Sequence, residues 1–374
     1  MPWTRRVDDM SNPAEAIQTG AQPITSAAGS NALLEVKNLK LEFGVGQKSV
    51  RAVDDVSFHI RAGETLCLVG ESGCGKSVSA LSIARLVPTP PAKYVGGEIL
   101  LNGKDVLRMS NSELRGIRGG VVSYIFQEPG SSLNPVFRVG NQIRESLKLH
   151  RPEVNTDAEV IRLLKLVGIP APESRIRDYP HQLSGGMQQR IMIAMALASQ
   201  PKLLVADEPT TALDVTIQAQ IIELLRDLKR QFGMAMLLIT HNLGIVGDIA
   251  DRVAVMYAGQ IVELAPANAL LTRPFHPYTQ ALMSSVPKLR STATKLTAIP
   301  GNVPNLGAFP SGCRFHPRCF KARRDCPQKP PELVEVEPGR WVRCHYWNAP
   351  LPTPEEALNP NNPALLQSRE LARS

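Results

Sequence analysis

Hydrophobic residues follow two different spacings along this chain, and these predict strands and helices. Residues 34–43 alternate between apolar and polar positions, which is typical of a half-exposed strand. Continuous apolar runs at 203–206 and 236–239 predict buried strands of a parallel sheet. The helix expected between these runs has an apolar face formed by Ile217, Ile221, Leu224, Leu225 and Leu228. This alternation of strands and helices predicts an α/β fold with a parallel sheet covered on both faces.

Two further regions complete the predicted architecture. Strand patterns at 53–60 and 97–103 predict an antiparallel β flap beside the parallel core. Residues 139–149 and 158–167 have helical spacing, and prolines follow each of them. We therefore expect a helical subdomain, at about 128–190, inserted between the two halves of the core.

The ends of the chain lack periodic hydrophobic positions. Residues 1–31 are predicted to be a disordered tail, and residues 350–374 a loose, Pro-rich tail. The sequence contains no apolar run of about 18 residues that could span a membrane, and its N-terminus lacks the apolar region of a secretory signal. These features predict a cytosolic protein, and its net charge of +8 suggests an anionic neighbour.

A glycine-rich stretch connects a predicted buried strand, 64–69, to a predicted helix, 78–86. It reads Gly70-Glu71-Ser72-Gly73-Cys74-Gly75-Lys76-Ser77 and fills every fixed position of the phosphate-binding loop. Its backbone N–H groups would form a nest for phosphate oxygens at the positive end of the helix dipole. Lys76 would reach the β- and γ-phosphates, and the Ser77 hydroxyl would hold Mg²⁺. The stretch predicts binding of ATP or another nucleoside triphosphate.

Two carboxylates follow one of the apolar strands. Asp207 and Glu208 come directly after the run 203–206. An acid at the tip of such a strand lies beside the phosphate loop in a doubly wound sheet. Asp207 is predicted to bind Mg²⁺ through its water shell. Glu208 points the other way and is predicted to act as the base on the attacking water.

A second anion-binding helix start is predicted at Leu183-Ser184-Gly185-Gly186-Met187-Gln188-Gln189-Arg190. Ser184, Gly185 and Gly186 open a helix predicted at 187–199. One ATP needs only one phosphate loop, so this second site implies the nucleotide of a second chain. The stretch resembles the signature sequence of ABC-type ATPases. The resemblance implies a P-loop NTPase core in which the signature closes over ATP held by a partner subunit.

The same resemblance assigns further catalytic roles. Gln127, after a strand predicted at 121–126, matches the glutamine that senses Mg²⁺ and the attacking water. His241 matches the switch histidine that contacts the γ-phosphate. Because Glu208 and His241 are both present, we expect a site that hydrolyses ATP.

The resemblance also implies residues that hold adenine and join two chains. Phe43 best fits the aromatic side chain that stacks on adenine. Asp214 ends the stretch Thr211-Ala212-Leu213-Asp214 and matches a residue at the contact between protomers. Two such chains would hold two ATP molecules between them, and hydrolysis would let the dimer open.

Two stretches resemble the ATPases of dipeptide/oligopeptide importers. They are Gln127-Glu128-Pro129-Gly130-Ser131-Ser132-Leu133-Asn134-Pro135 and Arg273-Pro274-Phe275-His276-Pro277-Tyr278-Thr279-Gln280-Ala281-Leu282. Many members of that group have Asp where Glu128 stands. The resemblance covers about residues 32–346, with an ABC ATPase domain at 32–265 and a Pro- and Cys-rich C-terminal extension at 266–349.

This resemblance implies a motor for peptide import at the cytoplasmic face of the membrane. Its partners would be a second ATPase subunit, identical or related, two membrane permeases and an external solute-binding protein. Importers of nickel or other small solutes use related ATPases, and soluble ABC proteins act on nucleic acid. The chain has no basic stripe interleaved with aromatic residues, so no nucleic-acid partner is expected. Its positive charge suits the anionic inner leaflet.

Four of the six cysteines lie in the C-terminal quarter of the chain, at Cys313, Cys319, Cys326 and Cys344. In a cytosolic protein this clustering favours a metal site over disulfides. The thiolates could hold a four-iron four-sulfur (4Fe-4S) cluster or Zn²⁺, or stay free or disulfide-linked. The resemblance to peptide-importer ATPases implies the cluster. The arginines expected to offset its negative charge are Arg314, Arg318, Arg323, Arg324 and Arg343.

Overall fold

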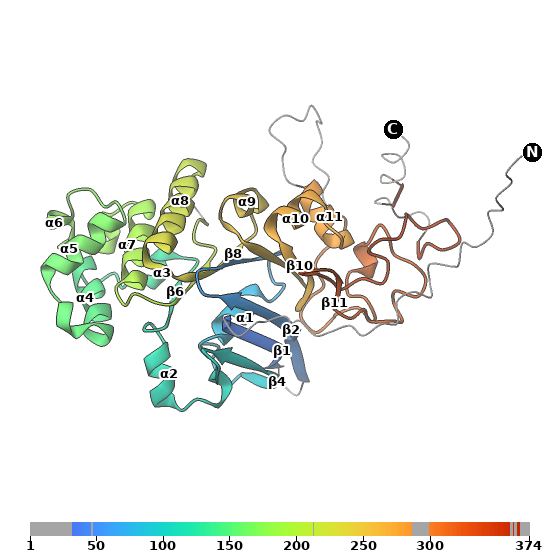
Figure 1. Ribbon diagram of the computed structural model, residues 1–374, viewed down its shortest axis with the longest axis horizontal. Helices are drawn as coiled ribbons and strands as arrows, with labels where there is room; N and C mark the ends of the chain where they lie inside the picture. Colours follow the sequence, from blue (N-terminus) through green and yellow to red (C-terminus); the bar gives the residue numbers. More distant parts are fainter. Residues whose placement is uncertain are drawn as a thin grey trace, which may run out of the picture.

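The computed structural model describes residues 32–45, 48–211, 213–285, 299–359, 362, 365 and 366. The tail predicted at 1–31 lies outside the described residues, as does most of 360–374. Two sheets organise the described chain, one antiparallel and one mixed. Figure 1 shows a group of helices at one end of the molecule and the C-terminal segment at the other.

The antiparallel sheet has the strand order β2-β1-β4-β5. Its strands are β1 (Ala32–Val45), β2 (Lys48–Arg61), β4 (Ala92–Leu101) and β5 (Lys104–Asp105). Its central strand β1 carries the alternating pattern of the sequence, with Leu34, Val36, Leu39 and Leu41 buried. The predicted antiparallel flap is therefore confirmed.

The mixed sheet has the order β11-β12-β10-β9-β3-β8-β7-β6. Its parallel part consists of β3 (Thr65–Val69), β6 (Val122–Ile125), β7 (Leu203–Asp207), β8 (Ala235–Thr240) and β9 (Arg252–Tyr257). Its antiparallel edge consists of β10 (Gln260–Pro266), β11 (Val334–Glu337) and β12 (Arg340–Val342). The C-terminal extension therefore continues the core sheet, which the sequence did not predict.

Side chains along β3 alternate between two hydrophobic cores. Leu66 and Leu68 belong to the core shared with the antiparallel sheet. Cys67 and Val69 belong to the core shared with the helices on the opposite face. The mixed sheet is covered on both faces, as predicted, but one of its covers is largely a second sheet.

The structure contains the five helices predicted from the sequence, with shifted ends, and further short helices that were not predicted. They are α1 (Lys76–Ser82), α2 (Asn111–Ile117), α3 (Pro129–Ser132), α4 (Val139–His150), α5 (Asp157–Leu166), α6 (Pro172–Arg175), α7 (Gly185–Leu197), α8 (Val215–Phe232), α9 (Val246–Ile249), α10 (Ala267–Thr272) and α11 (Pro277–Ser284). Helix α1 ends before the predicted Leu86, because Arg85 takes a left-handed conformation with φ of 50°. No helix in the described part is long and apolar enough to cross a membrane.

Candidate nucleotide-binding site

The phosphate loop lies between the end of β3 and the start of α1. Gly75 caps the helix with φ of 104°, in the left-handed region that favours glycine. A Cβ atom at Gly70 would lie 2.2 Å from the Met256 carbonyl oxygen, so no larger residue fits there. No side chain caps α1, and its first turn carries no acid. The backbone N–H groups of this turn are therefore suited to bind an anion.

Lys76 is buried and folds back over the loop. Its Nζ atom donates hydrogen bonds to the carbonyl oxygens of Gly70, at 2.8 Å, and of Glu71, at 3.0 Å. Both acceptors belong to the loop itself. The ammonium group is therefore held at the phosphate loop and not in an ion pair elsewhere.

Asp207 ends β7 beside the start of α1. Burial raises the pKa of its carboxyl group, while a hydrogen bond from the Ser77 side chain acts in the opposite direction. Within the described residues, the buried Oδ1 atom of Asp207 has no hydrogen-bond partner. An oxygen without a partner beside a hydroxyl fits the oxygen ligands that Mg²⁺ prefers.

The Glu208 carboxylate is contacted by polar side chains from three loops. Its Oε2 atom accepts hydrogen bonds from Gln127 Nε2, at 3.1 Å, and from Thr211 Oγ1, at 2.9 Å. His241 Nδ1 lies 3.3 Å from the same oxygen. Gln127, Glu208 and His241 follow the neighbouring parallel strands β6, β7 and β8, whose carboxyl ends share one edge of the sheet. The structure therefore brings together all three residues that were predicted to be catalytic.

Thr211 belongs to the stretch Thr211-Ala212-Leu213-Asp214, in which the sequence predicted a role for Asp214 but none for Thr211. Its hydroxyl reaches Glu208 because Glu208 adopts a positive φ of 47° and the chain turns back within three residues. Backbone conformation of this kind leaves no periodic signal in a sequence. Ala212, in the same motif, lies outside the described residues.

The signature residues lie apart from the phosphate loop of their own chain. Ser184 caps α7, and its hydroxyl accepts a hydrogen bond from the Met187 N–H at 3.4 Å. Gly185 and Gly186 form the first turn of α7, so this helix starts two residues before the predicted position. Figure 1 shows α7 within the group of helices at one end, away from α1. One chain therefore does not join its own signature to its own phosphate loop.

Asp214 and Phe43 occupy positions with clear local roles. The Asp214 carboxylate caps α8 by accepting the Ile217 N–H at 2.9 Å. Phe43 lies near the end of β1, opposite Val50 of β2, and packs partly against the core between the sheets. Its half-buried ring leaves one part open to a further contact.

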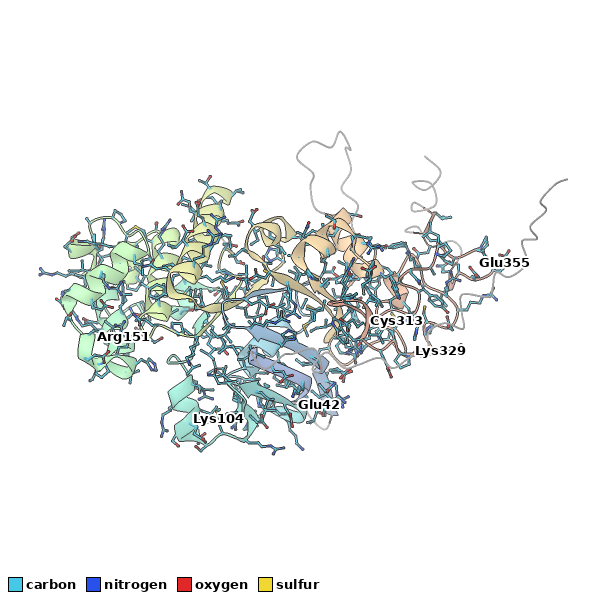
Figure 2. The ribbon with its side chains drawn as sticks, viewed as in Figure 1. Glu42, Lys104, Arg151, Cys313, Lys329 and Glu355 are labelled. Carbon is cyan, nitrogen blue, oxygen red and sulfur yellow. The ribbon has the colours of Figure 1, made fainter. Side chains whose placement is uncertain are left out.

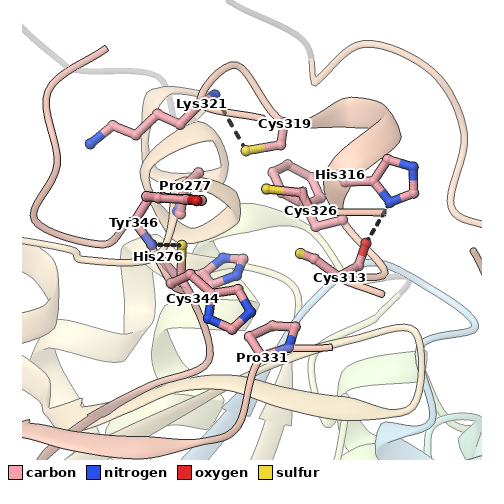
Figure 3. A pocket seen from close by; sticks show the side chains of 12 residues that line it. His276, Pro277, Cys313, His316, Cys319, Lys321, Cys326, Pro331, Cys344 and Tyr346 are labelled. Carbon is pink, nitrogen blue, oxygen red and sulfur yellow. Dashed lines mark hydrogen bonds between the residues drawn. The ribbon is translucent and has the colours of Figure 1, made fainter. Parts of the chain in front are cut away.

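The four C-terminal cysteines line one cavity (Figure 3). Backbone N–H groups donate to Cys319 Sγ from Lys321 at 3.3 Å, to Cys326 Sγ from Arg323 at 3.3 Å, and to Cys344 Sγ from Tyr346 at 3.4 Å. Burial raises the pKa of the Cys313 thiol to about 11 and that of Cys344 to about 12. Figure 2 shows Cys313 on the side of the molecule away from Arg151 of the helical subdomain.

None of the six cysteines, all of which are described, forms a disulfide. Within the described residues, no group of three or more His, Cys, Asp or Glu side chains is arranged to hold a metal ion. Figure 3 shows the four cysteine sulfur atoms around this cavity.

The expectation that neighbouring arginines offset charge at the cysteines is wrong for three of the five, which pair with acids of the core. Arg323 pairs with Glu356, and its positive charge also acts against the burial that raises the pKa of the Cys326 thiol. Arg314 pairs with Asp54, Arg318 with Glu71, and Arg343 with Asp55. All three acids belong to the ATPase domain. Pairing with fixed carboxylates of the core satisfies these guanidinium groups, so they brace the extension against the core.

Comparison with known proteins agrees with this geometry. Residues 53–211 match the ABC transporter family, and residues 262–326 match the oligopeptide/dipeptide transporter C-terminal region. The ATP-binding cassette MJ0796, solved as a dimer in a post-hydrolysis state bound to ADP and Pi, has a TM-score of 0.56 and 27% identity. The match covers 63% of this chain and 98% of that chain. Fold and phosphate loop together define an ABC-type ATPase.

Similar proteins of known name show which family of ABC-type ATPases the chain belongs to. The chain is 51% identical over 316 residues to a probable peptide ABC transporter ATP-binding protein, y4tR, of Sinorhizobium fredii, covering 83% of this chain and 94% of the relative. It is 50% identical over 317 residues to the oligopeptide transport ATP-binding protein AppD of Bacillus subtilis, covering 84% and 97%. This chain belongs to the family of ATP-binding subunits of oligopeptide and dipeptide ABC transporters.

Proposed function

We propose that this chain hydrolyses ATP to drive peptide import through a membrane ABC transporter. The observation that carries the proposal is the convergence of Gln127, Glu208 and His241 beside a complete phosphate loop. The peptide substrate is supported by the C-terminal region, residues 262–326, which matches oligopeptide/dipeptide transporters. Relatives named for oligopeptide and dipeptide transport support the same assignment.

In the proposed site, the backbone of the phosphate loop binds the phosphates of ATP. Lys76 would exchange its two carbonyl partners for phosphate oxygens. Ser77, Asp207 and Gln127 would hold Mg²⁺, which would supply polarisation of the γ-phosphate. Glu208 accepts a proton from the attacking water, and its contacts with Gln127, Thr211 and His241 hold its carboxylate in place. His241 contacts the γ-phosphate. Phe43 stacks on adenine through the open part of its ring.

Two chains complete the site. Ser184, Gly185 and Gly186 bind the γ-phosphate of ATP held by a second ATPase subunit, identical or related, because α7 lies away from α1 within one chain (Figure 1). Asp214, which fixes the start of α8, lies at the contact between the two subunits. Two permeases and an external solute-binding protein are the remaining partners. The subunit binds at the cytoplasmic face of the membrane.

The expected result for this function is an ATPase rate that rises when the chain is reconstituted with its permeases in proteoliposomes. Peptide-loaded binding protein should raise it further, because cargo biases the permeases toward the state that closes the ATPase dimer. Phosphate release is the measurement, with empty liposomes, DNA and ribosomes as controls. Stimulation by DNA or ribosomes, and none by the permeases, contradicts the transport role.

We propose that Cys313, Cys319, Cys326 and Cys344 hold a 4Fe-4S cluster, with Zn²⁺ as the alternative. The residues fit this group in that four thiols line one cavity, and three of them accept backbone N–H groups, which oppose in part the burial that raises their pKa. A single zinc ion requires four ligands at about 2.3 Å from one point. The cluster is the group that the resemblance to peptide-importer ATPases implies.

Replacing Cys319 with Ser is expected to remove the brown colour and most of the iron from anaerobically purified protein. The reason is that Ser offers a hard oxygen where the cluster needs a thiolate. Visible absorbance and iron content per chain are the measurements, with about four iron atoms expected in the unchanged protein. Cys67→Ala is the matched control, since Cys67 is buried in β3 outside the cavity. Colourless unchanged protein with one zinc per chain contradicts the assignment.

A further inference from the structure

Three arginines join the cysteine-rich extension to the ATPase domain. Each directly neighbours a cysteine of the cavity, and their partners are acids of the core: Arg314 with Asp54, Arg318 with Glu71, and Arg343 with Asp55. Arg318 and Arg343 have only 5% and 6% of their side chains exposed. Their acid partners are more exposed, at 29% for Glu71 and 36% for Asp55, so each pair joins a buried guanidinium group to a carboxylate that solvent still reaches.

The pair between Arg318 and Glu71 differs from the others because Glu71 belongs to the phosphate loop. Arg318 Nη1 lies 2.7 Å from one carboxylate oxygen of Glu71, and Arg318 Nη2 lies 3.0 Å from the other. This is the two-pronged geometry in which an arginine fixes the orientation of a carboxylate as well as its charge. The two residues are 247 positions apart in the sequence.

The backbone of Glu71 is also held on both sides. Its N–H donates to the Tyr278 hydroxyl at 3.0 Å, and its carbonyl oxygen accepts from Lys76 Nζ at 3.0 Å. Tyr278 lies in α11, so both contacts that reach Glu71 from beyond the loop come from the C-terminal part of the chain. Glu71 therefore connects that part to the lysine expected to bind phosphate.

Arg318 is itself positioned by its surroundings. Its Nε atom donates to the Pro300 carbonyl oxygen at 2.9 Å, and its guanidinium group lies 5.8 Å from the centre of the Tyr257 ring. Tyr257 packs against Tyr278 at 4.7 Å and against Phe315 at 5.2 Å between ring centres. This aromatic cluster joins the two elements that hold Glu71, so the guanidinium group cannot move without disturbing both.

We propose that Arg318 is a positioning residue for ATP binding, acting through Glu71 of the phosphate loop. ATP brings several negative charges to this loop, and an unpaired Glu71 carboxylate there would repel them. Arg318 neutralises that carboxylate and keeps it turned away from the phosphates. The C-terminal extension thus contributes to the nucleotide site through Arg318. This inference rests on the proposed assignment of residues 70–77 as the ATP-binding loop.

The test is a double-mutant cycle on the full-length chain, with the Kd and KM for ATP and kcat measured for each variant. Arg318→Gln is expected to raise Kd and KM about tenfold and to change kcat much less, because it leaves a negative charge beside the phosphates. Glu71→Gln removes the carboxylate, and its own KM is the reference value against which the double variant is compared. The double variant, Glu71→Gln with Arg318→Gln, is expected to restore KM nearly to the value of Glu71→Gln alone.

A matched control separates positioning from general stability. Arg340 is also a buried, ion-paired arginine of the extension, but it pairs with Glu337 at 3.2 Å and lies over Phe275. Arg340→Gln should lower the melting temperature without raising KM. If Arg318→Gln behaves like Arg340→Gln, or raises KM equally with and without Glu71, the proposal is overturned.

Two further variants keep the test decisive. Tyr278→Phe removes only the acceptor of the Glu71 N–H and should raise KM several-fold even if Arg318→Gln folds poorly. An unchanged KM in Tyr278→Phe counts against the proposal.

Lys76→Met distinguishes failure of the ATP-binding assignment of residues 70–77 from failure of the positioning role of Arg318. If it binds ATP normally, the loop assignment fails. If it loses ATP while Arg318→Gln does not weaken binding, only the positioning role fails.

Discussion

Replacing Glu208 with Gln is expected to lower the ATPase rate by about 10²–10⁴-fold while ATP still binds. Gln keeps the size of the side chain and can still accept hydrogen bonds from Gln127 and Thr211, but it cannot take a proton from water. Binding is preserved because the phosphate loop is untouched. Steady-state phosphate release gives the rate, and equilibrium binding of ATP with Mg²⁺ gives the affinity.

The same variant should collect in the closed dimer when ATP is present, because the bound γ-phosphate is not removed. Size-exclusion chromatography with and without ATP measures this. Glu223→Gln is the matched control, since Glu223 is exposed on α8 and pairs only with nearby Arg226. Near-normal turnover in Glu208→Gln would falsify its role as base, and a monomer with bound ATP would contradict the shared site.

The sequence predicted the site well where a motif is contiguous or follows a parallel strand. The phosphate loop needed only its own eight residues, from Gly70 to Ser77, and a strand and helix on either side. Gln127, Glu208 and His241 are far apart in the sequence. They could be grouped because each follows a strand of one parallel sheet, and the resemblance to ABC-type ATPases supplied their roles.

The joining of the extension to the core could not be predicted in this way. Strands β11 and β12 have four and three residues, too few for a periodic pattern. They pair with each other, and β12 also pairs with β10 far back in the chain. The pairing of Arg318 with Glu71 depends on side chains 247 positions apart. Charge patterns in a sequence identify basic residues but not their partners, and the arginines were therefore assigned to the cysteines.

The ends of helices were also difficult to predict from the sequence. Helix α1 begins at Lys76, inside the phosphate motif, where no hydrophobic spacing marks a start. Its N-terminal cap is Gly75, which has a left-handed backbone conformation. The sequence motif shows that a glycine stands there but does not show which conformation it adopts. This early start matters for function, because it places Lys76 and Ser77 on the first turn of the helix.

Replacing Lys76 with Met is expected to weaken ATP binding by about ten- to a hundredfold and to stop hydrolysis at ordinary ATP concentrations. Met has a similar length and fills the buried space, so the fold should persist. What is lost is the ammonium group, which within the described residues donates its hydrogen bonds to the loop, at the Gly70 and Glu71 carbonyl oxygens and the Cys74 sulfur. Equilibrium binding of ATP and the melting temperature are the two measurements.

The loss of binding should come with a melting temperature close to, or above, that of the unchanged chain without nucleotide. A buried ammonium group loses hydration that two carbonyl oxygens restore only in part, so an apolar side chain of similar size is tolerated in the empty loop. Adding ATP should then raise the melting temperature of the unchanged chain but not of Lys76→Met. Lys104→Met, at an exposed position in β5, should respond to ATP normally. Equal stabilisation of all three proteins by ATP would place the nucleotide away from this loop.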